Sequence, residues 1–182
     1  MRVLILDAPQ VLLDERRRRG EDRRDEMWDG VPHLQPLLDN AHQDLATKFL
    51  LTVAPLVESA SLEGRYHPGL FRTDDDYRVP DQAYFRPGCA SARGLESADL
   101  VVEIRSSWDE TYEKFDFYAR VGVREVLILH PRPRRVELFR NVEGRILPVQ
   151  PGAGVYSEVL GIALHVEDDE LVVTWNDGSA RI

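Results

Sequence analysis

The chain has 182 residues, a formal net charge of -9 and a single cysteine, Cys89. This length predicts a single domain with a sizeable core, which we place at residues 25–182. Residues 1–24 are expected to form a charged N-terminal extension. One cysteine excludes an internal disulfide and a cysteine-rich zinc site. The acidic charge excludes a surface that coats itself with nucleic acid by bulk electrostatics. No segment resembles a signal peptide or a membrane span, so we expect a cytoplasmic protein without membrane contact.

The segment from Leu12 to Arg24 is dense in charge. It holds the runs Arg16–Arg19 and Arg23–Arg24 among four acids. Because the acids nearly cancel the arginines, we interpret the segment as a solvated helix with many ion pairs. The alternative, that the run from Arg16 to Arg24 contacts phosphate, stays open.

The next segments predict a strand, a turn and a long helix. Glu26–Gly30 has the pattern of a strand running into a turn at Asp29-Gly30. Apolar residues recur at three- and four-residue steps from position 41 to 58, which indicates an amphipathic helix. We expect Asn40 to cap this helix and Pro55 to kink or end it. His42 and Gln43 fall in its first turn and belong either to a polar face or to the edge of a site.

The centre of the chain has the pattern strand, helix, strand. Leu100–Ile104 is apolar on both faces except for Glu103, which is typical of a central strand. A helix is expected from about position 109 to Gly122, and a second apolar strand at 126–129. Residues 99–130 therefore predict a βαβ unit with parallel strands. The neighbouring segments predict a solvated turn at Asp74–Asp76, a strand at 78–86, an exposed strand at 135–140 and short strands from 148 to 182.

Three residues of this pattern could carry chemistry. Asp81 lies near a strand start, Glu103 inside a buried strand and Lys114 on the following helix. Two carboxylates suit a hard cation such as magnesium, and a lysine can position water or neutralise charge on a phosphate. Structural alternatives remain: Asp81 could cap a turn, Glu103 could pair with Arg105 or with an arginine elsewhere, and Lys114 could pair with Glu110.

Several motifs resemble one known family. They are Pro80-Asp81, the segment Ala98–Ser106, the segment Glu113–Glu125, Glu26 with Asp29-Gly30 followed by His42-Gln43, and Ser157–Gly161. Together they resemble the Putative restriction endonuclease family, once filed as a domain of unknown function, within the PD-(D/E)xK nuclease superfamily. The resemblance spans roughly residues 25 to 175. It implies an α/β fold with a mixed (α+β) central sheet flanked by helices, metal ligands Asp81 and Glu103, and catalytic Lys114.

The resemblance also implies a function. The expected activity is that of an endonuclease which hydrolyses DNA with Mg²⁺ or Mn²⁺, with Glu26, His42, Gln43 and Arg105 at the rim of the site. The superfamily pattern has a lysine where this chain has Arg105. In this family the lysine comes instead from the following helix, which corresponds to Lys114 here. Arginine is a poor general base, so a binding or regulatory module that kept the fold and lost the chemistry is the alternative. A homodimer would match the two-fold symmetry of duplex DNA.

Overall fold

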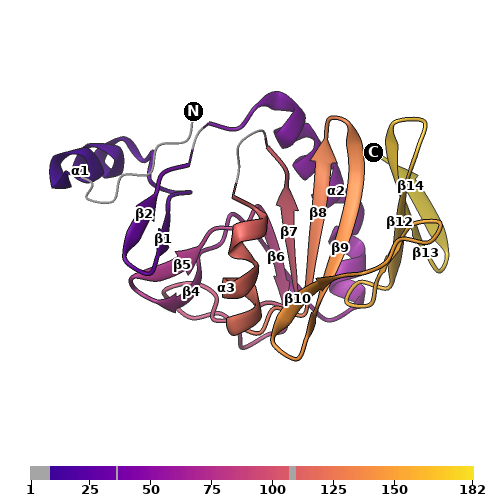
Figure 1. The fold of residues 1–182 in the computed structure, drawn as a ribbon. Helices are drawn as coiled ribbons and strands as arrows, with labels where there is room; N and C mark the ends of the chain where they lie inside the picture. The colour runs from indigo at the N-terminus through magenta and orange to yellow at the C-terminus, as the bar shows by residue number, and fades with distance from the viewer. Residues whose placement is uncertain (1–8, 36, 107–109) are drawn as a thin grey trace.

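The centre of the molecule is a mixed sheet. The computed structural model describes residues 9–35, 37–106 and 110–182. Within these residues the sheet has six strands in the order β10-β9-β8-β7-β6-β3 (Figure 1). The strands are β3 (Glu63–Tyr66), β6 (Gln82–Phe85), β7 (Leu100–Ile104), β8 (Glu125–Pro131), β9 (Arg134–Val142) and β10 (Arg145–Pro148). β7 and β8 are parallel and every other neighbouring pair is antiparallel. The predicted mixed sheet and βαβ unit are confirmed.

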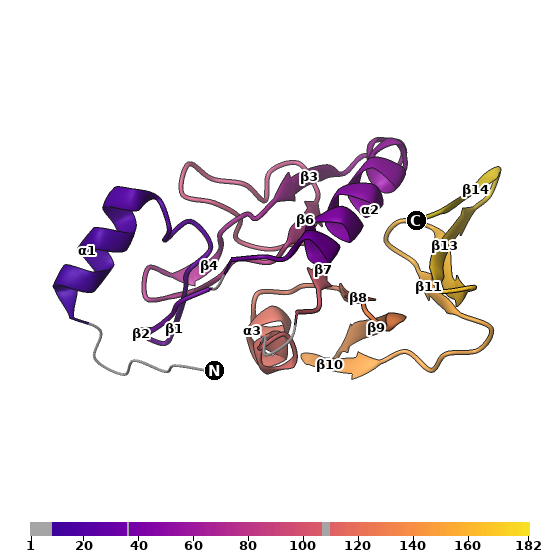
Figure 2. The ribbon, with the colours of Figure 1, turned by 90° about the horizontal axis from the view of Figure 1, so that it is seen from above.

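Two layers cover the faces of this sheet. The alternation along β7 sends Leu100, Val102 and Ile104 to one face and Val101 to the other. The first face packs against α2 (Asn40–Ser59) and an antiparallel sheet of β11 (Val155–Ser157), β12 (Ile162–Glu167), β13 (Glu170–Trp175) and β14 (Gly178–Arg181). The second face packs against α3 (Phe115–Arg120). Figure 2 shows α2 and α3 on opposite sides of β7, so a charged side chain in this strand is enclosed.

The N-terminal part forms a separate sheet beside the central one. Its order is β2-β1-β5-β4, with β1 (Glu26–Trp28), β2 (Val31–His33), β4 (Leu70–Thr73) and β5 (Asp76–Arg78). Helix α1 (Gln10–Arg19) extends away from it, and none of its residues, all of which are described, is buried (Figure 1). Arg17 and Arg19 pair with acids of the same segment, as predicted. The boundary between residues 24 and 25 stays a prediction.

Three features of α2 and β5 differ from the sequence predictions. Asp39, not Asn40, caps α2, because its carboxylate accepts the His42 amide at 2.8 Å. Pro55 does not end α2, which continues to Ser59, and the kink at Pro55 stays a prediction. Pro55 is exposed, so the carbonyl it leaves without an N–H lies on the solvent side while the opposite side of α2 stays packed. Asp76 is not solvated: it is buried against Arg72 and Arg78.

The connection after β7 also differs from the prediction. Residues 107–109, where the helix was expected to begin, lie outside the described residues. After them the chain enters a 3-10 turn, η1 (Tyr112–Lys114), and α3 begins only at Phe115. Likewise, β6 begins at Gln82, so the predicted strand at 78–86 is divided between β5 and β6. Lys114 is therefore placed by a tight turn against the sheet and not by the second turn of a helix.

The C-terminal sheet is fastened to the central sheet through Glu125. This buried carboxylate at the start of β8 accepts the Ser157 hydroxyl at 2.6 Å and the Glu158 amide at 3.0 Å. Arg140 of β9 donates to it at 3.0 Å and compensates its charge. The Ser157–Gly161 segment thus has a structural role at the start of β8, where Glu125 pairs with Leu100 and not with Glu103.

Candidate active site

Glu103 lies in the middle of the molecule and is 4% exposed. Its Oε1 accepts a hydrogen bond from the Lys114 ammonium at 3.0 Å and a short one from the Tyr118 hydroxyl. Burial raises the pKa of Glu103 to about 7, and the Lys114 charge opposes that rise. A buried carboxylate needs such partners, because its desolvation is otherwise costly. The sequence predicted this need, but the partner is Lys114 instead of Arg105.

Lys114 connects Glu103 to a third acid. Its Nζ lies 3.0 Å from Glu103 Oε1 and 2.8 Å from Glu26 Oε1, and the residue is 6% exposed. Although burial lowers the pKa of Lys114, the two carboxylates outweigh it and raise that pKa above its usual range, so the amine is an ammonium. Lys114 therefore pairs with two buried acids and not with Glu110.

Glu26 is held by its own strand, β1, and by Val79, the residue after β5. Its Oε1 also accepts the Val79 amide at 2.8 Å, and its Oε2 accepts the Trp28 indole N–H at 2.8 Å. Trp28 is fixed in turn between the His33 ring, stacked at 4.0 Å, and the Arg78 guanidinium at 4.2 Å. The N-terminal sheet thus positions one carboxylate of the site.

Asp81 immediately precedes β6, beside the last residues of β7. The antiparallel register pairs Gln82 with Val102, and Asp81 Oδ2 accepts the Ile104 amide at 2.7 Å. Asp81 Oδ1 contacts Nε2 of His42 at 2.9 Å and Nε2 of His67 at 3.2 Å. Burial would raise the pKa of Asp81, but these histidines and the amide hold it well below its usual range, so it is ionised.

The tautomer of His42 follows from its partners. Because an ionised carboxylate only accepts, Nε2 of His42 must carry the proton it donates to Asp81. Its other nitrogen, Nδ1, lies 3.0 Å from the Ser106 hydroxyl. His42 therefore bridges the residue before β6 and the end of β7, and it is itself fixed by the first turn of α2. This arrangement orients Asp81 in the way that outer partners orient metal ligands.

The structure groups five of the seven residues named from the sequence. The contacts above join Glu26, Lys114 and Glu103 in one group and His42 and Asp81 in a second, and the amide of Ile104, next to Glu103, donates to Asp81. Gln43 is exposed and donates to the Leu38 carbonyl at 3.2 Å, and Arg105 lies over the Tyr112 ring at 4.5 Å. Neither of these two contacts reaches the other five residues.

Three contributors were missed by sequence reasoning. They are His67, Tyr118 and Ser106, which bind Asp81, Glu103 and His42 respectively. Tyr118 could have been found, because it follows Lys114 by four positions and shares its helical face. His67 follows β3 in a polar segment with no periodicity, so no local signal marks it.

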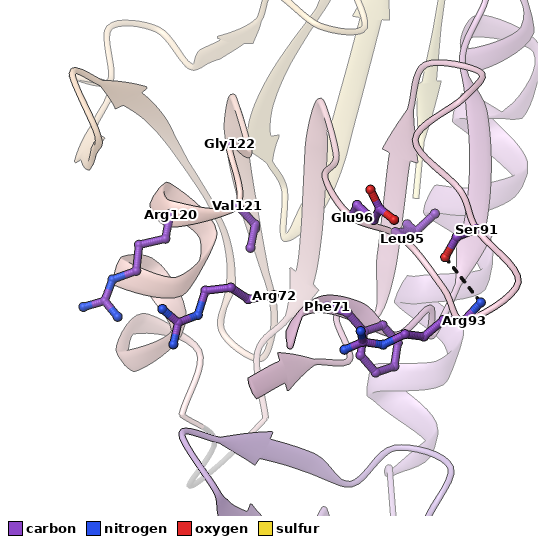
Figure 3. A pocket seen from close by; sticks show the side chains of 9 residues that line it. All are labelled: Phe71, Arg72, Ser91, Arg93, Leu95, Glu96, Arg120, Val121 and Gly122. Carbon is purple, nitrogen blue, oxygen red and sulfur yellow. Dashed lines mark hydrogen bonds between the residues drawn. The ribbon is translucent and has the colours of Figure 1, made fainter. Parts of the chain in front are cut away.

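A pocket of about 470 Å³ lies at the other end of α3 (Figure 3). Arg72, Arg93 and Arg120 are among its lining residues, which in the described chain include none of the site residues. Arg72 pairs with Asp76 and Asp29, and Arg93 pairs with Asp74 while covering the Phe71 ring. Two of its three guanidinium groups are therefore already neutralised.

The chain resembles known proteins both in sequence and in fold. A family model described as "Putative restriction endonuclease" (Uma2) matches residues 12–167. The chain belongs to this family. A solved structure, described as a putative nuclease belonging to DUF820 from Anabaena variabilis ATCC 29413, superposes with a TM-score of 0.61 at 16% identity. The match covers 75% of this chain and 82% of that one, and it shows a shared fold. A search of curated proteins found no match.

Two structural findings bear on how a Uma2 protein of this kind could work. Among the described residues, no three His, Cys, Asp or Glu side chains form a ready-made metal cluster. Among the described helices, none is long and apolar enough to cross a membrane. Magnesium does not require such a cluster, because one or two carboxylates with water and substrate phosphate can complete its shell.

Proposed function

We propose that the chain is a metal-dependent endonuclease that hydrolyses DNA phosphodiester bonds. The observation that carries this proposal is the buried Lys114 ammonium held against Glu103 of β7. Ionised Asp81 lies directly before β6, the strand next to β7, and accepts the Ile104 amide. Buried charges cost several kcal/mol each, and packed apolar residues are often as stable. A purely structural role gives little reason for so many charges at one point. Membership of the Uma2 family supports the same assignment.

The residues fit a hard divalent cation, Mg²⁺ or Mn²⁺. Carboxylate oxygens are the ligands that such cations prefer. Glu103 uses only Oε1 for its partners, and Oε2 accepts no hydrogen bond from the described residues. Asp81 is held ionised and pinned to β7 by the Ile104 amide. Asp81 and Glu103 would be the ligands, with Glu26 as a nearby acid.

The roles of the side chains follow from their contacts. A bound cation would supply positive charge beside the phosphate and acidify a coordinated water. His42 and His67 would keep Asp81 oriented toward the cation. Lys114 would position the attacking water or neutralise the charge that develops on phosphorus. Tyr118 would hold Glu103 in place through its hydroxyl.

The direct test is cleavage of supercoiled plasmid by the purified protein with MgCl₂ or MnCl₂. We expect nicked or linear DNA with the metal, none with a chelator, and none with Glu103→Gln or Asp81→Asn. Gln43→Ala, next to His42 but facing solvent, is the matched control and should cut like the wild type. Cleavage by Glu103→Gln at the wild-type rate would overturn the assignment of the site.

A second candidate is a module of this fold that binds without cutting. It is favoured by one observation: Glu103 and Lys114 already compensate one another. Calorimetry with MnCl₂ alone separates the two candidates. A site that disappears in Asp81→Asn supports the enzyme, and absence of cation binding in the wild type supports the module.

A further inference from the structure

The Lys114 ammonium occupies the point between two buried acids. The side chains of Glu26 and Glu103 are 0% and 5% exposed, and that of Lys114 is 8% exposed. Nζ approaches one oxygen of each at 2.8 and 3.0 Å. Three such charges out of water are tolerable only together, because each ion is stabilised by its neighbours. The single ammonium is therefore shared between the two carboxyl groups.

A divalent cation on the other oxygen of Glu103 would compete with the ammonium for the charge of the same carboxylate. It carries twice the charge of the ammonium and prefers carboxylate ligands. If it is to bind Glu103, the ammonium and the cation cannot share the charge of that carboxylate without repelling each other. Lys114 has the means to move, because its long side chain extends from the short turn η1 and not from the middle of a rigid helix.

We propose that Lys114 is a displaceable counter-ion, whose ammonium leaves the carboxylates of Glu26 and Glu103 when a divalent cation binds Glu103. This inference rests on the proposed function, since it takes Glu103 as a ligand. It adds that the lysine is held on the acids in the cation-free protein and reaches the substrate side only in the loaded one. The same lysine thereby lowers the apparent affinity for the cation.

The first measurement follows Lys114 in the wild type. The chain has two lysines, Lys48 on the exposed side of α2 and Lys114. Brief acetylation with acetic anhydride, read by mass spectrometry, gives the ratio of modification at Lys114 to that at Lys48. We expect saturating MgCl₂, in the absence of DNA, to raise this ratio severalfold. An unchanged ratio at a Mg²⁺ concentration shown by calorimetry to fill the site would overturn the inference.

The second measurement removes the competitor. Lys114→Met keeps the side-chain length without the charge, and Lys48→Met is the matched control. If the ammonium occupies the acids at least nine-tenths of the time, its removal should tighten MnCl₂ binding about tenfold or more. The melting temperature of Lys114→Met should also rise further with MnCl₂ than that of the wild type. Equal or weaker binding by a folded Lys114→Met would overturn the inference.

These measurements separate the inference from the proposed function. Cation binding with an unchanged acetylation ratio removes the displaceable lysine and leaves the nuclease assignment standing. Absence of cation binding in both the wild type and Lys114→Met removes both. If Lys114→Met does not fold without metal, the acetylation ratio of the wild type decides alone.

Discussion

Replacing His42 by alanine should disable the site without touching a proposed ligand. The imidazole is 2% exposed, donates to Asp81 at 2.9 Å and lies 3.0 Å from the Ser106 hydroxyl. Its loss leaves Asp81 with His67 and the Ile104 amide as its partners. Outer partners of this kind are typically worth 10- to 100-fold in metal affinity or activity. We therefore expect His42→Ala to weaken MnCl₂ binding and to slow plasmid cleavage by about 10- to 100-fold.

The same substitution should reduce stability by a smaller, separable amount. A buried hydrogen bond to a charged group contributes roughly 1.5–3 kcal/mol, so the free energy of unfolding should fall by about that much. Calorimetry, plasmid cleavage and urea unfolding at pH 7 measure the three effects on one preparation. The reasoning is refuted if His42→Ala, once shown to be folded, binds MnCl₂ and cleaves as well as Gln43→Ala.

Two further predictions concern stability away from the site. Ser157→Ala removes the hydroxyl that donates to buried Glu125 at 2.6 Å, so the free energy of unfolding measured in urea should fall by about 1.5–3 kcal/mol while MnCl₂ binding is unchanged. A fall no larger than that caused by Ser179→Ala, at an exposed serine, would contradict this prediction. For Asp76, burial raises the pKa but its two arginines lower it more, so the stability it contributes is complete above its ordinary pKa and is lost as the pH falls through the folded value. Asp76→Asn should therefore have a lower free energy of unfolding than the wild type at pH 7. That free energy should also fall less on acidification to pH 3, and an equal fall in both proteins would count against the ion pairs.

The sheet could be predicted because the local sequence pattern identifies its central strands. The run Leu100–Ile104 is apolar on both faces, and only a strand covered on both sides satisfies such a pattern. The parallel partner β8 follows from the connection length and from its own apolar run. The single acid in the run was the signal for the site, since an acid at a covered position must have a partner.

The partners themselves could not be predicted, because they depend on tertiary contacts. Glu103 had several cations within reach in the sequence, and only the turn at Tyr112–Lys114 decides that Lys114 reaches it. The predicted cap of α2 was wrong for the same reason, because Asp39 and Asn40 are both good capping residues and the local sequence does not select between them. His67 reaches Asp81 through the pairing of β3 with β6, which no local pattern encodes.

The contacts of the site span long stretches of chain. His42 and Asp81 are 39 positions apart, His42 and Ser106 are 64 apart, and Val79 and Glu26 are 53 apart. Closing such loops costs entropy before any contact repays it, and folding rates fall as contacts become less local. The charged cluster therefore cannot exist in a chain that is only partly folded or partly synthesised. The side chains of this cluster meet only when the β2-β1-β5-β4 sheet, α2 and the βαβ unit have all come together, so an incomplete chain lacks the cluster.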